Sequence, residues 1–338
     1  MQCPTRLYFS GVSGDTRRML RALILLLLSA LSSVVHAQYP ARPVLLVVPY
    51  SAGSDADLSG RNLAQHASRY LAESVVVMNQ PGASGAIGTL AVHDAAPDGY
   101  RLLLTRIASQ VILPATDSKT PYMPTDFTFI SVLEINPYVC AVKGDAPYAS
   151  MKELIADIRA RPGKLNFATV GDGTIQNFGP QYLFSLLKMP KDSAAGVPYK
   201  GSGELVAALV GGHVEFACSN LGALLGQFRA GTLRPLMTTT RQPLKELPDV
   251  PTARSLGWPQ MESLAAWSAL VGPPKLPREV VQRWSDVMTK LARDPAWIAG
   301  TEKLGGTPAV RSPTETERFV REQYQLYDGL AKRLGLRQ

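Results

Sequence analysis

The sequence predicts an α/β protein with mainly parallel sheets and two lobes. Short apolar runs alternate with amphipathic stretches along most of the chain, and turn signals such as Pro81-Gly82 and Pro97-Asp98-Gly99 separate the repeated units. Alternation of this kind is typical of parallel strands joined by crossover helices. The 338 residues also exceed the length of one ordinary core, so the chain is expected to divide into two lobes.

The first series of elements lies before residue 134. Its apolar runs have the length and composition of buried strands, and the stretches between them have helical periodicity. The expected strands are 44–48, 75–78, 101–105 and 127–133, and the expected helices are 57–71 and about 85–95.

A second series lies between residues 139 and 238. Its first helix has clear end signals, because Ser150 and Glu153 form a capping box and Pro162-Gly163 ends the helix. The expected strands are 139–142, 165–169, 197–199, 214–218 and 233–238, and the expected helices lie near 150–161, 174–187, 203–210 and 221–230.

A third block follows the proline-rich loop 243–251. It contains an expected strand at 267–271 and expected helices near 277–292 and 314–334, the last with a second capping box. No linker marks a boundary between the lobes. This is expected if the chain crosses between lobes within its strands and later returns.

The N-terminus has the pattern of a cleaved signal peptide over residues 1–37. Three arginines precede an uncharged apolar run over residues 22–35, and Val35 and Ala37 supply the small residues expected before a cut ahead of Gln38. The alternative is a membrane anchor, but about 14 apolar residues fall short of the roughly 20 that a spanning helix needs. Met19 is an alternative start site. The mature chain is therefore expected to be exported.

Net charge and cysteine content narrow the possible partners. Loss of residues 1–37 removes four arginines and one aspartate, so the formal net charge falls from +8 to +5. A surplus that small, without a run of Lys or Arg, gives no argument for nucleic acid. Cys140 and Cys218 lie in apolar, strand-like contexts and could pair in an oxidising compartment. Because a chain of this length is stabilised by its core, the sequence favours two buried thiols instead.

The strongest candidate site follows the first expected strand. The apolar run ends at Pro49, passes through small residues and enters a helical pattern. Backbone N–H groups at such a helix start have no partners within the helix, and the helix dipole is positive there, so the segment predicts an anion site. Its candidate residues are Tyr50, Ser51, Ala52, Gly53, Ser54, Asp55 and Asp57.

Two further loops after expected strands have a similar composition. Open α/β sheets bind ligands beyond the carboxyl ends of their strands, where glycine permits close approach and hydroxyl groups add donors. The alternative for each loop is a tight turn with an ordinary helix cap, but three such loops in one chain favour a cleft. The candidates are Thr105, Ala108 and Ser109 in one loop and Val170, Gly171, Gly173 and Thr174 in the other.

Weaker candidates lie after later strands. Tyr199 can stack on a ligand or donate to it, and Lys200 offers a positive charge, although a half-buried Tyr and a surface Lys fit the pattern equally well. Asn220 closes another expected strand. Trp267 belongs to the core more readily than to a site.

Motifs for catalysis are incomplete. Gly171 and Gly173 begin a dinucleotide fingerprint, but Gln176 occupies its third glycine position. Residues 82–86 lack the second glycine of a nucleophile elbow. The histidines after residue 38 have no neighbours at familiar metal-ligand spacing. The sequence therefore predicts no enzyme, no metal and no cofactor.

Six short motifs stand in a fixed order along the chain. They are PYSAGSDAD at residues 49–57, NQPGASG at 79–85, APDGY at 96–100, PGKLNFA at 162–168, VPYKG at 197–201 and LPDVPT at 247–252. Together they resemble the Bug family, the periplasmic solute receptors of tripartite tricarboxylate transporters. The resemblance covers about residues 39–336.

This resemblance implies a type II periplasmic-binding-protein fold, in which two α/β lobes joined by two crossovers hold a ligand in the cleft between them. Lobe one would comprise residues 38–138 and 262–338, and lobe two residues 139–261. Receptors of this type close their lobes on the ligand. A periplasmic monomer without a cofactor is expected.

The resemblance also implies a function. In the family, backbone N–H groups of two loops hold one carboxylate of a small solute, and these loops match residues 49–57 and 170–177, which adds Asn177 to the candidates. The receptor would deliver an organic acid, an amino acid or a related solute to membrane permease subunits. The alternatives are a receptor that signals to a sensor kinase and an exported enzyme that uses Asp57 or Lys200.

Several residues depart from the family pattern. Asn177 stands where many members have His, and Phe178-Gly179-Pro180-Gln181 replaces a stretch of small residues and Glu, so Pro180 is expected in the first turn of its helix. Ser219 stands in place of a common Asp, and Ser54 in place of a usual Gly.

Asp55 is the most consequential departure, because the family usually has a small residue there. One hypothesis is that Asp55 points into the cleft and selects a ligand with an amine or amide beside its carboxyl group, since a second carboxylate would be repelled. The alternative is that Asp55 caps the helix from outside.

Overall fold

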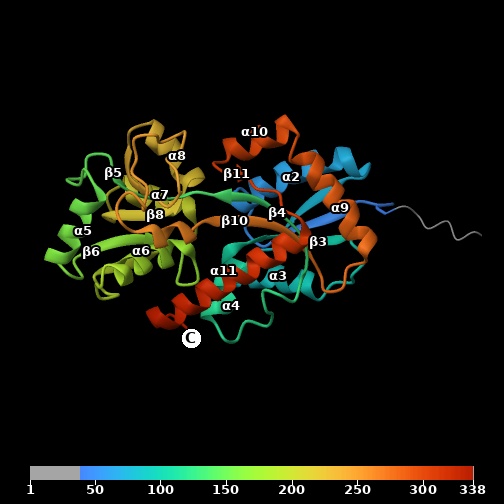
Figure 1. Ribbon diagram of the computed structural model, residues 1–338, viewed down its shortest axis with the longest axis horizontal. Helices are drawn as coiled ribbons and strands as arrows, with labels where there is room; N and C mark the ends of the chain where they lie inside the picture. The colour runs from blue at the N-terminus through green and yellow to red at the C-terminus, as the bar shows by residue number, and fades with distance from the viewer. Residues whose placement is uncertain (1–38, 338) are drawn as a thin grey trace, which may run out of the picture. The chain divides into compact units, whose positions relative to one another are not determined.

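Two mixed β-sheets form the framework of the protein (Figure 1). The computed structural model describes residues 39–337; the expected signal peptide at residues 1–37, with its alternative start Met19, lies outside this range. The strand order is β11-β4-β10-β3-β1-β2 in the first sheet and β7-β6-β8-β5-β9 in the second.

The first sheet takes its strands from two separate parts of the chain. β1 pairs in parallel with β2 and β3, whereas β10 pairs antiparallel with β3 and β4, and β11 antiparallel with β4. The expectation of mainly parallel sheets is therefore wrong. The strands are β1 (Val44–Val48), β2 (Val75–Asn79), β3 (Arg101–Arg106), β4 (Thr128–Asn136), β10 (Ala266–Gly272) and β11 (Thr307–Pro308).

The second sheet is mixed in the same way. β6 pairs in parallel with β7 and β8, and β5 pairs antiparallel with β8 and β9. Its strands are β5 (Tyr138–Lys143), β6 (Leu165–Thr169), β7 (Ala194–Pro198), β8 (Phe216–Asn220) and β9 (Leu233–Thr238).

Two crossovers explain the antiparallel pairs. β4 leaves the first sheet and β5 enters the second with only Pro137 between them. The chain returns from β9 to β10 through a segment that contains the 3-10 turn η3 (Pro259–Ser263). Because outgoing and returning strands lie side by side, β4 with β10 and β5 with β9 run in opposite directions. Two α/β sheets joined by two crossovers confirm the predicted fold.

Helices cover both faces of the first sheet. Leu46 and Val47 are consecutive in β1 and point to opposite faces, and they join different apolar clusters. α2 and α9 supply one cluster, which contains the fully buried Trp284, and α3, α4 and α11 pack in the other. These helices are α2 (Asp55–Leu71), α3 (Ala86–His93), α4 (Leu113–Thr116), α9 (Arg278–Leu291), α10 (Pro295–Lys303) and α11 (Pro313–Leu334).

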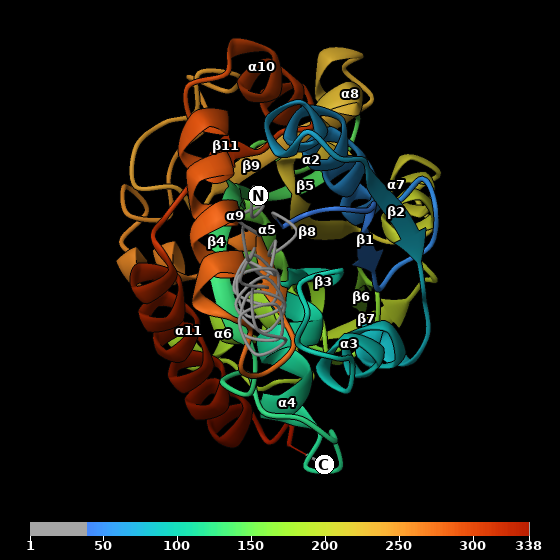
Figure 2. The same cartoon turned by 90° about the vertical axis from the view of Figure 1, so that its right-hand side faces the viewer.

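The second sheet is covered on both faces as well. Cys140 and Ala141 of β5 point into different clusters, one shared with α5 and α6 and the other with α7 and α8. The α6 cluster continues into the first sheet, since α11 lies against α6 (Figures 1 and 2). The helices are α5 (Met151–Ala160), α6 (Ile175–Leu186), α7 (Ser202–Val210) and α8 (Leu221–Arg229).

The two predicted capping boxes have different outcomes. At α11, Ser312 Oγ accepts from the N–H of Glu315, and the Glu315 carboxylate accepts from the N–H of Ser312, so the box is confirmed. At α5, Ser150 Oγ accepts from the N–H of Glu153, but the Glu153 carboxylate accepts from the N–H of Ala149 instead. Only half of that box forms.

Cys140 and Cys218 are joined by a disulfide, so the favoured interpretation of two free thiols is wrong. The two cysteines face each other in the antiparallel pair β5–β8. Residues directly opposite in such a pair place their side chains on the same face within reach of each other. The bond therefore follows from strand register, which the sequence does not reveal.

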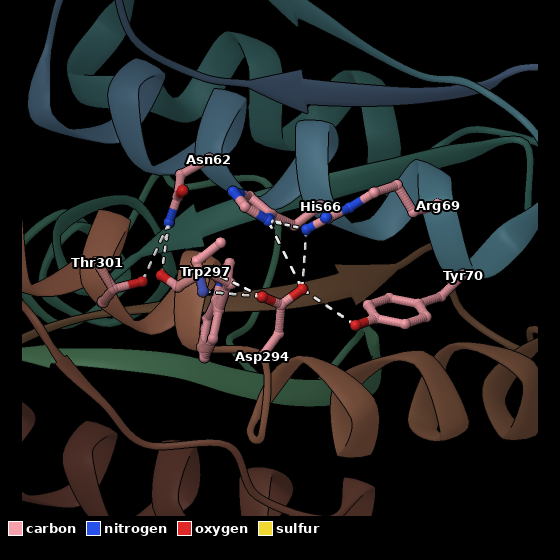
Figure 3. A network of polar contacts seen from close by, with 8 residues as sticks. Asn62, His66, Arg69, Tyr70, Asp294, Trp297 and Thr301 are labelled. Atoms are coloured by element: carbon pink, nitrogen blue, oxygen red, sulfur yellow. Dashed lines mark hydrogen bonds and ion pairs between the residues drawn. The ribbon is translucent and has the colours of Figure 1, made fainter.

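A polar network fixes the far half of α2 against α10 (Figure 3). The buried carboxylate of Asp294 accepts from Arg69 Nη2 at 2.9 Å and from the Tyr70 hydroxyl at 3.0 Å. Arg69 also contacts His66 Nδ1, and Asn62 donates to the carbonyl of Trp297 at 3.2 Å. Burial alone would raise the pKa of Asp294, but these bonds and those from the α10 backbone lower it. The network leaves α2 little freedom to move within its lobe.

Among the helices of residues 39–337, none is both long and apolar enough to cross a membrane.

Trp267 lies in the core, fully buried in β10, and its indole N–H donates to Gln323 at 3.3 Å.

Candidate functional site

A cavity of about 600 Å³ lies where loops from both sheets meet. The loops after β1 and β3 contribute from the first sheet, and the loops after β6, β7 and β8 contribute from the second. Each loop leaves the carboxyl end of its strand, as expected for a ligand site in an α/β sheet. We call residues 50–56 the α2 start and residues 170–176 the α6 start.

The α2 start leaves several backbone donors unpaired in residues that line the cavity. Ser54 is the helix cap, because its Oγ accepts from the N–H of Asp57 at 3.3 Å. Asp55 is the first helical residue and lines the cavity, so it does not cap the helix. The N–H groups of Ser51, Ala52, Asp55 and Ala56 have no acceptor within residues 39–337. All four residues line the cavity.

Asp57 supports this loop from behind and does not line the cavity. Its carboxylate accepts from the N–H of Gly53 at 2.8 Å, from Arg61 Nε at 3.0 Å and from Asn79 Nδ2 at 2.9 Å. Burial alone would raise the pKa of Asp57, but these hydrogen bonds outweigh it and lower the pKa. The Gly53 amide is therefore occupied, and the Ser54 amide donates to the Ser51 carbonyl at 3.2 Å.

The α6 start offers a second set of donors. Thr174, Ile175 and Gln176 line the cavity, and their N–H groups have no acceptor within the described chain. The Gly171 amide instead donates to Thr169 Oγ1 at 3.2 Å. Asn177 is buried and donates to the carbonyl of Asp172 at 3.4 Å, away from the lining. The lining residues of the α6 start itself, Val170 and 174–176, carry no charged side chain.

Residues far from the loop hold α6 in place. The hydroxyl of Tyr138, at the first crossover, donates to the carbonyl of Ile175 at 2.9 Å. Gly179 makes room for it, because a Cβ there would lie 2.1 Å from the Tyr138 hydroxyl oxygen. Phe178 stacks edge-on against Tyr327 of α11, with ring centroids 5.4 Å apart. Burial of Tyr138 raises its pKa well above the ordinary value, so the hydroxyl stays a donor.

Pro180 lies inside α6, beyond its first turn, so its expected position is wrong. Proline has no N–H to donate to the carbonyl four residues before it, which is that of Gln176. The unusual segment 178–181 thus contacts both α11 and the first crossover. It also contains a break in the helical hydrogen bonding, at Pro180.

Two more helix starts reach the cavity from the second sheet. Ser202 and Gly203 begin α7, and Asn220 precedes α8. Tyr199 and Lys200 line the same side, with Lys200 exposed and without an ion pair within the described chain. A helix N-terminus is equivalent to about half a positive charge, so the starts of α2, α6, α7 and α8 together favour an anion.

The sequence reasoning missed Arg106, which is buried and lines the cavity. Its Nη1 donates to Ser268 Oγ at 3.0 Å and lies 3.7 Å from Glu134 Oε1. Ser268 Oγ in turn donates to Glu134 Oε1 at 2.9 Å, so the carboxylate balances the guanidinium charge. A charged residue at the carboxyl end of a strand with an apolar centre was the available signal.

The remaining predicted residues divide between the lining and its support. Tyr50 lines the cavity, and burial raises the pKa of its hydroxyl although Ser109 lies within hydrogen-bonding reach. The lining contains Tyr50, Ser51, Ala52, Gly53, Ser54, Asp55, Ala108, Val170, Thr174, Tyr199, Lys200 and Asn220. Outside the lining are Asp57, Thr105, Ser109, Gly171, Gly173 and Asn177.

Other lining residues come from the motif after β2, which the sequence analysis quoted without assigning it to the site. Gly82, Ser84 and Gly85 face the cavity. Gly85 has a φ of 94°, and a Cβ there would lie 2.9 Å from Ser109, so the turn requires glycine. Within residues 39–337, no group of three or more His, Cys, Asp or Glu side chains is placed to hold a metal ion.

Comparison with known proteins identifies the family of the protein. Residues 60–336 match the family model of the tripartite tricarboxylate transporter family receptor. The chain belongs to this family. Its members are periplasmic solute receptors, so the predicted Bug-type fold and receptor class are confirmed.

Individual relatives support the same family assignment. Protein BugT of Bordetella pertussis is 31% identical over 302 residues, which cover 88% of this chain and 90% of BugT. The R. palustris protein Rpa4515, solved with adipate, is 27% identical, has a TM-score of 0.81 and aligns over 88% of this chain and 98% of its own. MatC from Rhodopseudomonas palustris, solved with bound malate, is 25% identical with a TM-score of 0.78 over 86% and 99% of the two chains.

Proposed function

We propose that this chain is an exported receptor that holds the carboxylate of a small organic acid or amino acid in the cavity. The observation that carries the proposal is that the α2 start and the α6 start, from different sheets, have unpaired N–H groups on residues that line the same cavity. Relatives whose structures hold adipate and malate support a carboxylate as the ligand.

The energetics fit such a ligand. A hydrogen bond to a charged group contributes about 1.5–3 kcal/mol, so several backbone donors reach the roughly 8 kcal/mol of micromolar binding. Because backbone amides hold the carboxylate, the side chains around it are free to vary. We infer that they select the remainder of the solute.

We propose binding without chemical conversion. The lining has hydroxyl groups at Ser51, Ser54, Ser84 and Ser202 but no histidine, and the side chains of Asp55 and Lys200 make no hydrogen bond to these hydroxyls within the described chain. A nucleophile without a base in hydrogen-bond reach is not activated. An exported enzyme that uses Asp57 is disfavoured, because that carboxylate is engaged by Gly53, Arg61 and Asn79.

We further propose that residues 1–37 are removed on export to the periplasm, where the receptor acts as a monomer and delivers its solute to permease subunits. The Cys140–Cys218 disulfide supports an oxidising compartment. We assign residues 38–138 and 262–338 to lobe one and residues 139–261 to lobe two, because the chain changes sheet near these positions.

The test removes one backbone donor at a time. Asp55→Ala deletes the carboxylate and keeps the amide, whereas Asp55→Pro deletes both. Proline is tolerated there because residue 55 is the first of α2 and Ser54 is extended, with ψ of 162°. We expect titration calorimetry with succinate, malate, adipate and aspartate to detect a bound acid, and Asp55→Pro to bind it about tenfold more weakly than Asp55→Ala.

Two results would contradict this function. Equal affinities of the two variants would show that the α2 amide does not hold the ligand. Recovery of a chemically altered acid after incubation with the protein would replace the receptor with an enzyme. Unfolding curves of both variants check that the proline leaves the fold intact.

A further inference from the structure

One residue of the cavity lining has a carboxylate without a partner in residues 39–337. Asp55 lines the cavity at the first position of α2 and has no hydrogen bond or ion pair within residues 39–337. Ser54 already caps the helix, so capping does not account for Asp55. The neighbouring acid Asp57 is fully engaged by the loop and Asn79. Asp55 is thus an anion placed beside donors that would bind one.

A second unpaired acceptor faces the same cavity from the other sheet. Asn220 is 6% exposed, lies at the end of β8 and lines the cavity. Its Oδ1 is buried and has no hydrogen-bond partner within the described chain. Buried polar atoms in native proteins are nearly always paired, so an orphan acceptor in a binding cavity indicates a donor on the ligand.

The charges of the lining indicate a ligand with no net charge. Arg106 is balanced by Glu134. The other charged side chains of the lining are Asp55 and Lys200, which have opposite signs and come from loops of different sheets. A cavity with one free anion and one free cation fits a zwitterion better than a dianion, because the dianion would meet Asp55 with a like charge.

We propose that the solute is an amino-carboxylate. Its carboxylate binds the free amides of the helix starts, and its ammonium group is received by the Asp55 carboxylate and Asn220 Oδ1. This inference rests on the proposed function and adds the chemical class of its ligand. The backbone donors account for any carboxylate, whereas the two acceptors account only for a ligand that also carries N–H donors.

The experiment uses matched probes that differ by one amino group. The exported chain is titrated with aspartate against succinate, glutamate against glutarate, alanine against propionate, and phenylalanine against 3-phenylpropionate. We expect the native protein to bind at least one amino member about tenfold or more tightly than its deaminated partner, which is the effect of one charged hydrogen bond.

Asp55→Asn then tests the residue. The variant keeps the size of the side chain and the backbone amide but loses the charge. We expect the preference for the amino member to fall about tenfold, while the plain acid binds as well as before or more tightly. The matched control is Asp192→Asn in the loop between α6 and β7, because Asp192 is exposed and does not line the cavity. It should leave both affinities unchanged.

Three outcomes would overturn the inference. The first is a native protein that prefers the plain acids, and the second is an amino preference that Asp55→Asn leaves intact. Either leaves the carboxylate receptor standing, since acids still bind. The third is an absence of binding by all eight probes, which would count against the proposed function as well.

Discussion

The two helix starts that face the cavity are held in different ways. The α2 start is fixed within its own lobe, by the Asp57 carboxylate at the loop and by the Asp294 network at the far end of the helix. The α6 start is held by Tyr138 of the crossover and, through Phe178, by Tyr327 of α11. One half of the site is therefore anchored locally. The other is attached to the elements that connect the lobes.

We expect this difference to decide how ligand binding affects the connection between the two sheets. A ligand that orders the α6 start acts on a helix that touches the crossover directly through a hydrogen bond of 2.9 Å. The α2 start, by contrast, can hold the ligand without passing strain to the connection. We expect variants near α6 to change affinity through lobe geometry, and variants behind α2 to act mainly through local stability.

The largest effect is expected from the disulfide, which joins two strands of the second sheet. Replacing Cys140 and Cys218 by alanine should lower the free energy of unfolding by about 2–4 kcal/mol, because the bond closes a long loop in the unfolded chain. Denaturant titration measures the change. Reductant should destabilise the native chain by a similar amount and leave the double variant unaffected; an equal response of both would contradict the bond.

Gly179→Ala should be the next most severe change. The added Cβ would lie 2.1 Å from the Tyr138 hydroxyl oxygen, so either α6 or the Tyr138 side chain must shift and their contact is disturbed. Overpacking of this kind costs about 1–3 kcal/mol, and we expect acid binding to weaken together with stability.

Gly226→Ala in α8 is the matched control, because a Cβ there meets nothing within 4 Å. It should stabilise the helix by about 0.5–1 kcal/mol and leave affinity unchanged. Native affinity for acids in Gly179→Ala would show that the contact between α6 and the crossover does not control ligand binding.

Asp57→Asn should have a smaller effect that depends on pH. The folded pKa of Asp57 lies below its ordinary value of 3.8, so its stabilisation is complete above that pH and is lost as pH falls through the folded pKa. We expect the variant to be about 1–2 kcal/mol less stable at pH 7 and the gap to close in acid. Unfolding curves between pH 2 and 7 measure it; a gap that does not change with pH would refute the role. Asp172→Asn in the α6 start is the control, and its free energy of unfolding should match that of the native protein.

Local sequence patterns predicted the helices and strands better than they predicted which strands pair and in which direction. Apolar runs and cap residues located most strands and helices, since both depend on neighbouring residues. Sheet direction did not follow, because the antiparallel pairing of β10 depends on where the chain returns after residue 238. The disulfide depends in the same way on the register that sets Cys140 opposite Cys218.

The candidate site was likewise predictable only where it depends on neighbouring residues. The loops at residues 49–57 and 170–174 were found because small residues after a strand have local meaning. Asp57 and Asn177 were placed with the ligand contacts, although folding directs them to the supporting side of the loops. Arg106 was overlooked because its charge acquires meaning only beside Glu134, which lies on a different strand.

The single residue between β4 and β5 has a further consequence. Proline fixes one of its two backbone angles, so Pro137 forms a short and stiff connection. An inserted residue at Pro137 would put β5 out of phase and turn each of its side chains to the opposite face. Length at this point is therefore as much a part of the binding architecture as any side chain.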